Sequence, residues 1–220
     1  MKKKIKLTLI GNSIKFKKVF KSIYPNAVIK VYPWRSINNT LFKKKNLLIK
    51  ADIVLICGYD YKSQWYNYKS YYRKNIINPL KLTKLVSRKK TIIFYIDTIN
   101  KITKKKNFKK KYTFSRYEFA KKELGNKLYN NFDIVKILKL PVLTNKKYEA
   151  DIYGNFLTKK IFNFLIYFNL INTLKTSNLK KFIIKKIFSR EKKNVNHLDP
   201  IFLKVPRSLF LDRILRVVHD

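Results

Sequence analysis

An apolar run at Ala51–Gly58, with the sequence ADIVLICG, is the feature that most limits how this chain can fold. Its middle, Ile53–Ile56, holds four consecutive apolar residues, and a glycine closes the run. A strand that is apolar on both faces has to be covered on both faces, which is typical of a parallel sheet lying between helices. We therefore predict that this run is a central strand of an α/β domain.

Other short apolar runs precede and follow this one, and helical patterns separate them. Apolar runs at Ile5–Ile10, Val28–Tyr32, Thr91–Ile96 and Ile134–Leu138 predict further strands, and the stretch Ile14–Ile23 has the pattern of an amphipathic helix. Strands that alternate with helices indicate right-handed βαβ units in a Rossmann-like, doubly wound parallel sheet. Ligands of such sheets bind beyond the carboxyl ends of the strands.

The helix that follows the Thr91–Ile96 strand contains a candidate acid–base pair. Ser115 and Glu118 have the spacing of a capping box, which predicts that the helix begins at Arg116. Tyr117 and Lys121 then share one helical face, where an ammonium group favours the phenolate and lowers the pKa of the tyrosine. Such a pair suits general acid–base catalysis. The same spacing also suits an ordinary surface helix, because the chain contains 15 tyrosines and is rich in lysine.

Charge and composition limit the classes of partner. Lysine and arginine number 52 against 12 aspartates and glutamates, which gives a formal charge of +40. Hydrophobic residues make up 46% of the 220, so we expect a folded domain with a substantial core. The lysines are spread along the whole chain together with many Asn, Ile, Tyr and Phe, as in proteins encoded by A/T-rich genes. No nucleic-acid-binding motif accompanies the charge, and nucleic acid is our third choice of partner.

The few metal-binding and sulfur-containing residues indicate neither a metal site nor a disulfide. Cys57 is the single cysteine and lies in the central apolar run, which fits a buried thiol in a reducing compartment. His197 and His219 lie far along the chain from other residues that bind metals. Lys2–Lys4 precede only a short apolar stretch, so we expect no secretory signal and a cytoplasmic location.

The pattern of apolar and charged residues changes near residue 145. We divide the chain into a Rossmann-like domain, 1–145, and a basic, helical C-terminal region, 146–220, which is a reduced substrate lobe or a docking tail. Ile161–Leu174 is apolar with lysine flanks and is shorter than the ~20 residues that a membrane span needs. It predicts a buried helix or, with the basic helix Leu179–Phe188, an interfacial helix on an anionic membrane. Pro200–Asp220 is expected to dock on the body.

Six segments carry a family resemblance through their order along the chain. They are the turn at Gly11, the strands Asp52–Gly58 and Ile93–Thr98, the helix Asn75–Leu80, the Tyr117-x-x-x-Lys121 pair, and the strand and turn Val135–Val142. This order resembles the short-chain dehydrogenase/reductase superfamily, and within it the nucleotide-sugar epimerase/dehydratase branch. The resemblance covers roughly Lys4 to Thr144 and implies that residues 1–145 form an NAD(P)-binding domain.

The resemblance implies a catalytic role for four residues. Tyr117 would exchange a proton with a substrate hydroxyl or carbonyl, and Thr98 would hydrogen-bond the same oxygen. Lys121 would lower the pKa of the tyrosine and bind the nicotinamide ribose, while Asn75 would help to hold the lysine. The substrate implied is a nucleotide-linked sugar, plausibly in surface polysaccharide biosynthesis, and hydride would pass to or from NAD or NADP.

The cofactor-binding residues implied by the resemblance lie in the turns that follow the first three predicted strands. Gly11, Asn12 and Ser13 correspond to the family's glycine-rich turn, and Gly58 to the small-residue turn after the central strand. Arg35 follows the second strand, where no acidic residue is present to bind a ribose hydroxyl. An arginine there would meet a 2′-phosphate, which favours NADP over NAD.

Two alternatives remain open. Tyr112 and Arg116 form a second register of the catalytic motif, Tyr-x-x-Ser-Arg, although Tyr112 would lie outside a helix that Ser115 caps. Ile14 and Lys17 stand where the family's turn has further glycines. This departure supports our second hypothesis, a non-catalytic Rossmann-like protein that has lost cofactor binding and acts at a membrane surface or with a partner, whereas the NAD(P)-dependent enzyme is our leading one.

Overall fold

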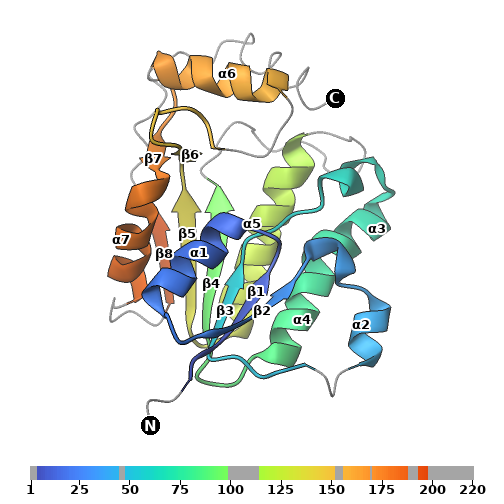
Figure 1. Cartoon of the computed structure of the whole chain (residues 1–220). Coiled ribbons are helices and arrows are strands. Elements are labelled where there is room, and N and C mark those ends of the chain that lie inside the picture. The colour runs from blue at the N-terminus through green and yellow to red at the C-terminus, as the bar shows by residue number, and fades with distance from the viewer. Residues whose placement is uncertain are drawn as a thin grey trace.

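A six-stranded, all-parallel sheet forms the centre of the computed structural model, which describes residues 4–44, 48–98, 114–151, 156–168, 170–187 and 193–197 (Figure 1). The strand order is β2-β1-β3-β4-β5-β8, with β3 inside the sheet as predicted. The strands are β1 (Lys6–Ile10), β2 (Val28–Tyr32), β3 (Ile53–Ile56), β4 (Ile92–Thr98), β5 (Val135–Leu140) and β8 (Lys193–His197). The predicted Rossmann-like, doubly wound sheet is confirmed.

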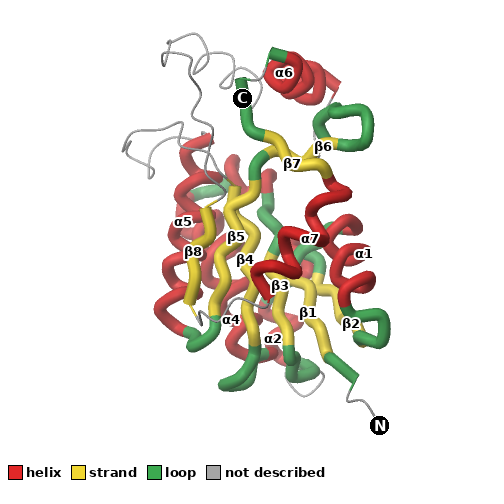
Figure 2. The backbone as a smooth tube through the Cα atoms, turned by 90° about the vertical axis from the view of Figure 1, so that its left-hand side faces the viewer, coloured by secondary structure: helices red, strands yellow, loops and turns green. Residues whose placement is uncertain are grey.

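Helices cover both faces of the sheet (Figure 2). α1 and α7 lie on one face, and α4 and α5 lie on the other. The helices are α1 (Ile14–Ile23), α2 (Asn39–Lys43), α3 (Tyr68–Tyr72), α4 (Asn78–Val86), α5 (Phe114–Asn131), α6 (Phe156–Tyr167) and α7 (Thr176–Ile187), and a small second sheet pairs β6 (Val142–Thr144) with β7 (Thr173–Lys175). No helix in the described ranges is long and apolar enough to cross a membrane.

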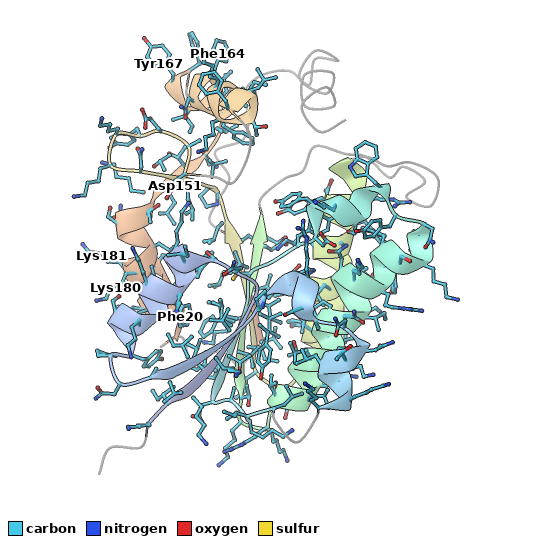
Figure 3. All side chains as sticks on the ribbon, turned by 45° about the vertical axis from the view of Figure 1, so that its right-hand side comes forward. Phe20, Asp151, Phe164, Tyr167, Lys180 and Lys181 are labelled. Atoms are coloured by element: carbon cyan, nitrogen blue, oxygen red, sulfur yellow. The ribbon has the colours of Figure 1, made fainter. Side chains whose placement is uncertain are left out.

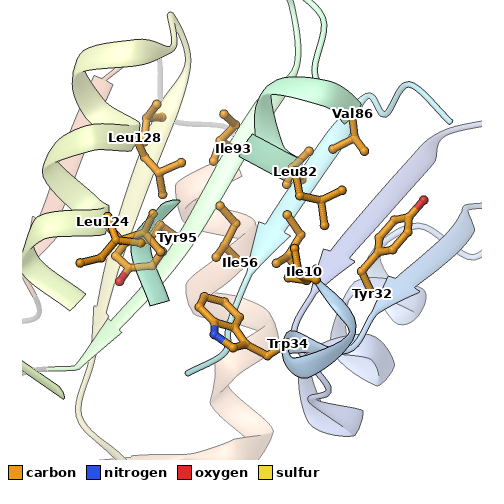
Figure 4. Close-up of a cluster of buried hydrophobic side chains, with 14 of the residues drawn as sticks. Ile10, Tyr32, Trp34, Ile56, Leu82, Val86, Ile93, Tyr95, Leu124 and Leu128 are labelled. Carbon is orange, nitrogen blue, oxygen red and sulfur yellow. The ribbon is translucent and has the colours of Figure 1, made fainter. Parts of the chain in front are cut away.

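Successive residues of the central strand supply two separate cores. Val54 and Ile56 belong to the cluster that includes Leu82 of α4, shown in Figure 4, whereas Leu55 belongs to the opposite cluster with Phe20 of α1. All five side chains are fully buried. Each side chain of this kind contributes about 1.5–3 kcal/mol through burial, so the uninterrupted apolar run is what commits the chain to a sheet covered on both faces.

The predicted start of α5 is wrong. The helix begins at Phe114, so Ser115 lies in the first turn and is not the capping residue. Contacts from distant parts of the chain hold this turn: the Tyr71 hydroxyl donates a hydrogen bond to the Arg116 carbonyl, and the Arg116 guanidinium donates one to the Tyr66 carbonyl. A local capping pattern could not reveal such long-range contacts.

The C-terminal region differs from its prediction in two respects. The apolar stretch Ile161–Leu174 is not one buried helix, because α6 ends at Tyr167 and only Thr158 and Leu165 of this helix are buried. The region also contributes β8, which pairs in parallel with β5 and extends the main sheet. The division of the chain near residue 145 stays a prediction, and 198–220 lie outside the described residues.

Candidate active site

The carboxyl ends of β1 and β3 approach each other so closely that Gly11 is required. Gly11 has a φ of +126°, and a Cβ atom there would lie 3.1 Å from both the Cys57 carbonyl carbon and the Gly58 nitrogen. Its own N–H donates a hydrogen bond of 2.9 Å to the Tyr32 carbonyl at the end of β2. The fold itself therefore demands a glycine here, whether or not the turn holds a ligand.

The first turn of α1 is already supplied with a negative charge. Ser13 caps the helix through a 3.4 Å hydrogen bond from the Phe16 N–H, and Asn12 is exposed. Lys15, in the first turn, forms a salt bridge of 2.6 Å with the Asp151 carboxylate, which also accepts a hydrogen bond from the Thr176 hydroxyl (Figure 3). The charge of Lys15 is therefore matched by a carboxylate of the same chain.

The space beside Gly58 is filled by the indole ring of Trp34. A Cβ atom at position 58 would lie only 2.3 Å from a carbon of that ring. Trp34 follows β2, is buried in the core cluster with Ile10 and Ile56 (Figure 4), and donates its indole N–H to the Asn75 side chain at 3.2 Å. The small residue after β3 thus makes room for a side chain of the same protein.

Asn75 lies at the centre of a buried hydrogen-bond network. Its carbonyl oxygen accepts from the Trp34 indole and from the Asp60 N–H at 2.9 Å, and its amide donates to the Ser63 hydroxyl and to the Tyr71 carbonyl at 3.2 Å. An asparagine side chain offers two acceptor sites and two donors, and all of them are used here. The observed contacts fix the segment after β3, and the role of Asn75 toward the catalytic lysine stays a prediction.

Arg35 forms an ion pair with a buried carboxylate. Its Nε lies 3.0 Å from Asp60 Oδ1, and the arginine side chain is 60% exposed whereas that of Asp60 is 2% exposed. A 2′-phosphate that approached Arg35 would therefore meet the negative charge of Asp60 as well. The predicted contact of Arg35 with NADP stays a prediction.

Tyr117 and Lys121 lie together on the buried face of α5. Both residues are 7% exposed, and the lysine Nζ lies 5.8 Å from the centroid of the Tyr117 ring. The same ammonium donates a 3.0 Å hydrogen bond to the Ile96 carbonyl near the carboxyl end of β4. The structure therefore brings the two side chains to the predicted edge of the sheet, with the ammonium directed into the strand.

Electrostatic contacts place the Lys121 ammonium near the turn that contains Gly58. Burial lowers the pKa of Lys121, and the Asp97 carboxylate and the Cys57 sulfur act in the opposite direction. Burial also raises the pKa of the Cys57 thiol to about 12, against smaller opposing effects of Lys121 and the Ser13 N–H. Cys57 thus connects the first turn of α1 with the lysine on α5, a contact that we did not predict.

Aromatic rings enclose the Tyr117 side chain. The Tyr59 ring packs edge-on at 4.8 Å between centroids, and the Tyr61 ring stacks at 5.6 Å with an interplanar angle of 13°. Burial of its hydroxyl end, together with the Tyr117 phenol, raises the pKa of Tyr61. The two tyrosines follow Gly58 directly, and this aromatic cluster after the central strand is the signal that would have revealed them.

The remaining predicted residues are only partly described. Thr98 is the last residue of β4, paired with Leu140 of β5, and its side chain lies outside the described atoms. Tyr112 also lies outside the described residues. Arg116 is buried, lies 4.9 Å from the Tyr71 ring centroid and donates at 2.8 Å to the Tyr66 carbonyl. Its partners are different from those of Lys121, and the alternative register stays a prediction.

The described residues offer no metal site and two small hollows. In the described ranges no group of three His, Cys, Asp or Glu side chains is placed to hold a metal ion. One hollow of about 130 Å³ is lined by residues that include Lys6 and Lys30, and another of about 300 Å³ by residues that include Tyr68 and Arg73. Neither is lined by a residue of the predicted site.

The residues present do not fit a dinucleotide bound along a glycine-rich turn. Glycines in that turn let the backbone approach the pyrophosphate and let the helix pack closely. Here Ile14 and Lys17 take those positions, with 59% of the Ile14 side chain exposed at the start of α1. Trp34 covers Gly58, and Asp151 brings a carboxylate to Lys15. The bulk of Ile14 and Trp34 and the negative charge of Asp151 would oppose a pyrophosphate at this turn.

Comparison with known proteins shows a similarity of fold and no match by sequence. No protein-family model and no curated protein matches the sequence. Among solved structures, the ADP-L-glycero-D-manno-heptose-6-epimerase of Helicobacter pylori is similar over 90% of this chain and 78% of its own, with a TM-score of 0.57 and 11% identity. WbmG of Bordetella bronchiseptica, solved with NAD and UDP, matches 99% of this chain and 81% of its own, with a TM-score of 0.56 and 11% identity.

A third similar structure is the UDP-glucose 4-epimerase of Thermotoga maritima, solved with UDP-glucose. It matches 84% of this chain and 74% of its own, with a TM-score of 0.53 and 10% identity. The resemblance to short-chain dehydrogenase/reductase structures, including nucleotide-sugar epimerases, is therefore confirmed for the fold.

Proposed function

We propose that this chain is a divergent protein of the short-chain dehydrogenase/reductase fold that has lost dinucleotide binding and acts as a non-catalytic partner in a glycan assembly system. The observation that carries the proposal is the Trp34 indole packed against Gly58. In this proposal the ring takes the space beside Gly58 that a cofactor would otherwise use, and its indole N–H is hydrogen-bonded to Asn75.

Moving Trp34 aside would be costly. The indole is 7% exposed and is hydrogen-bonded to Asn75, whose carbonyl oxygen would lose a partner. Removal of a buried tryptophan from a core costs about 3–5 kcal/mol. If a dinucleotide had to displace the ring at a cost of about 3 kcal/mol, its affinity would fall by roughly a hundredfold. Ile14 and Asp151 would add steric and electrostatic penalties.

Calorimetric titration with NAD, NADH, NADP and NADPH tests the proposal. We expect no saturable heat at millimolar dinucleotide, with either the wild-type chain or the Tyr72→Phe variant, which serves as a surface control. Saturable binding of any of these dinucleotides by the wild-type chain, unchanged by Tyr72→Phe, would overturn the loss of cofactor binding. Circular dichroism of the variant would show that the fold is retained.

A second candidate is an NAD(P)-dependent epimerase, dehydratase or reductase that acts on a nucleotide-linked sugar in surface polysaccharide biosynthesis. It is favoured by the position of Tyr117 and Lys121 near the carboxyl end of β4. It is also supported by the NAD and UDP in the WbmG structure and the UDP-glucose in the Thermotoga maritima epimerase.

In this second candidate, the chain's own residues handle a proton. The Tyr117 phenol would donate it to or accept it from the sugar oxygen, Thr98 would hydrogen-bond the same oxygen, and Lys121 would stabilise the phenolate. A bound nicotinamide would supply the hydride chemistry. Tyr117→Phe should then abolish turnover of a UDP-sugar in the presence of NAD(P), whereas Tyr72→Phe should retain it. Absence of turnover by the wild-type chain with both cofactors would exclude this candidate.

A further inference from the structure

The helix α6 exposes an apolar stripe that an ordinary core helix would bury. Phe156, Phe164 and Tyr167 are 73%, 58% and 80% exposed, and their spacing of eight and three residues places them on one helical face. Only Thr158 and Leu165 of this helix are buried. A surface helix of a globular domain normally turns its apolar residues toward the core, whereas α6 is apolar on both sides, with Leu165 buried and these three rings exposed.

The apolar stripe lies at one end of the molecule and points away from the sheet. Figure 1 shows α6 beyond the carboxyl ends of the strands, and Figure 3 shows Phe164 and Tyr167 on its outer side. On the inner side, the Asn163 side chain accepts a 2.6 Å hydrogen bond from the Ala150 N–H, and Leu165 is buried. The helix is thus held to the body by one face, and the opposite face is presented to the surroundings.

Lysines surround the apolar stripe. Lys160 lies within it, with its ammonium 4.5 Å from the centroid of the Phe156 ring, and Lys159 is exposed next to it. On neighbouring segments, Lys147 is exposed and Lys175 lies over the Tyr148 ring at 3.9 Å. The segment 145–187 contains nine lysines against two carboxylates, Glu149 and Asp151. Asp151 is held by Lys15, and Glu149 accepts a hydrogen bond from Asn145.

We propose that α6 docks this protein in the plane of an anionic membrane surface. The Phe164 and Tyr167 rings would enter the boundary between headgroups and acyl chains, and Lys159 and Lys160 would lie at the level of the lipid phosphates. The 12 residues of α6 extend about 18 Å, too short to span a bilayer but suited to lying in its surface. This surface is separate from the Gly11 and Gly58 edge and does not depend on whether that edge binds a dinucleotide.

The charge and the packing of the stripe favour lipid over two other occupants. Two copies of the chain that met through α6 would bring lysines against lysines in a protein of charge +40. Single-stranded nucleic acid stacks its bases on open aromatic faces. Here the Phe168 ring contacts both Phe164, at 4.7 Å, and Tyr167, at 5.1 Å, so the rings pack into one apolar cluster. An exposed cluster of aromatic rings with lysines within and beside it matches a lipid interface.

Co-sedimentation of the full chain with vesicles tests this proposal. We expect binding to vesicles of phosphatidylcholine mixed with phosphatidylglycerol to exceed binding to pure phosphatidylcholine by on the order of tenfold or more, and to weaken as salt is added. The variant Phe164→Ser/Tyr167→Ser should lose roughly tenfold or more in partitioning because it removes two inserted rings. The variant Lys159→Glu/Lys160→Glu should lose a similar factor on anionic vesicles.

Control variants make the same kinds of substitution outside α6, so they test whether the position on α6 matters. Lys180→Glu/Lys181→Glu makes the same charge change on α7, whose labelled lysines lie on the side of the molecule in Figure 3, and should retain most of the binding. Ile14→Ser removes an exposed apolar side chain from α1 and should leave binding unchanged. Circular dichroism and thermal unfolding would show that each variant keeps the fold.

Three results would overturn the proposal. They are equal binding to neutral and anionic vesicles, equal losses in the α6 and α7 lysine variants, and absence of wild-type binding to anionic vesicles at low salt. If single-stranded RNA bound instead, and the α6 variants abolished that binding, the surface would be a nucleic-acid site. If sedimentation velocity showed a dimer that Phe164→Ser/Tyr167→Ser dissociates, it would be a contact between copies.

Discussion

The two halves of the carboxyl edge of the sheet differ in how the chain fills them. At the ends of β1, β2 and β3, the chain fills the space itself: Trp34 packs against Gly58, and Lys15 holds Asp151 beside the first turn of α1. At the end of β4, Tyr117 and Lys121 remain side by side on α5. Tyr117 and Lys121 are therefore adjacent in one half of the edge, whereas side chains of the chain itself fill the other half.

The difference between the halves follows from what each arrangement requires. The sheet depends on many apolar residues, and their pattern survives exchange of one for another. Cofactor binding depends on a few positions without side chains, and one bulky residue at any of them is enough to end it. Tyr117 and Lys121 also fill the core, which gives them a structural role that does not need chemistry.

The largest expected effect concerns Cys57, which lies between the two halves. Because burial raises its pKa from 9.0 to about 12, the folded protein should present on the order of a thousandfold less thiolate at pH 8 than the unfolded chain. Iodoacetamide should therefore react slowly with the native protein and at an ordinary rate in urea. Equally fast alkylation in both states would show that the halves are open to solvent at this point.

The same raised pKa predicts how stability depends on pH. Above about pH 9 the unfolded thiol loses its proton while the folded thiol keeps it, so the contribution of Cys57 to stability is full below pH 9 and falls toward pH 12. Urea titrations across this window should show a smaller alkaline loss for Cys57→Ala than for the wild-type chain. Identical slopes in the two proteins would contradict the assigned pKa.

The next effect concerns Asn75, which organises the filled half. Asn75→Ala leaves the Trp34 indole N–H and the Asp60 N–H without their acceptor and removes the amide that donates to the Ser63 hydroxyl, so we expect a loss of about 3 kcal/mol in the free energy of unfolding. Asn78→Ala is the matched control, because that side chain donates a single hydrogen bond, to the Ile37 carbonyl. The control should lose about 1 kcal/mol. Equal losses would mean that the network is not concentrated at Asn75.

A double-mutant cycle measures the contact between Trp34 and Gly58. Gly58→Ala puts a methyl group within 2.3 Å of the Trp34 ring, so we expect it to cost about 2 kcal/mol in urea unfolding. In a Trp34→Ala background the same change should cost much less, with a coupling energy of about 1–2 kcal/mol. Additive effects would indicate that the indole does not occupy this space.

The smallest effect concerns the ion pair beside α1. Asp151→Asn weakens the 2.6 Å contact with Lys15, whose side chain is 24% exposed, and should cost about 0.5–1 kcal/mol. The control is Glu123→Gln, which weakens the 3.3 Å pair with Lys127 along α5 and should cost about 0.5 kcal/mol or less. A larger loss at Glu123 would show that Asp151 does not help to close the edge.

The sheet could be predicted from the sequence because its signals are local. Runs such as Ile53–Ile56 are apolar without interruption, and each identifies a covered strand by itself. β8 could not be found this way, because Lys193–His197 has a polar sequence and becomes a strand by pairing with β5. The start of α5 was misplaced for a related reason, since distant residues hold its first turn.

The site was predictable only in part. The Tyr117 and Lys121 spacing placed both residues on one face of a helix, since that relation is set by helical geometry. The contact of Trp34 with Gly58 joins residues from different loops, and a local sequence pattern cannot predict it. The direction of α6 was equally hidden, because an apolar stripe has the same spacing whether it faces the core or the surroundings.

Crystals grown with millimolar NAD or NADP test the central claim most directly. If the chain itself fills the cofactor edge, the electron density should show the Trp34 indole against Gly58 and Asp151 at Lys15, with no dinucleotide density at the Gly11 turn. A dinucleotide lying across Gly11 and Gly58, with the indole displaced, would contradict the claim and restore the enzyme as the leading candidate.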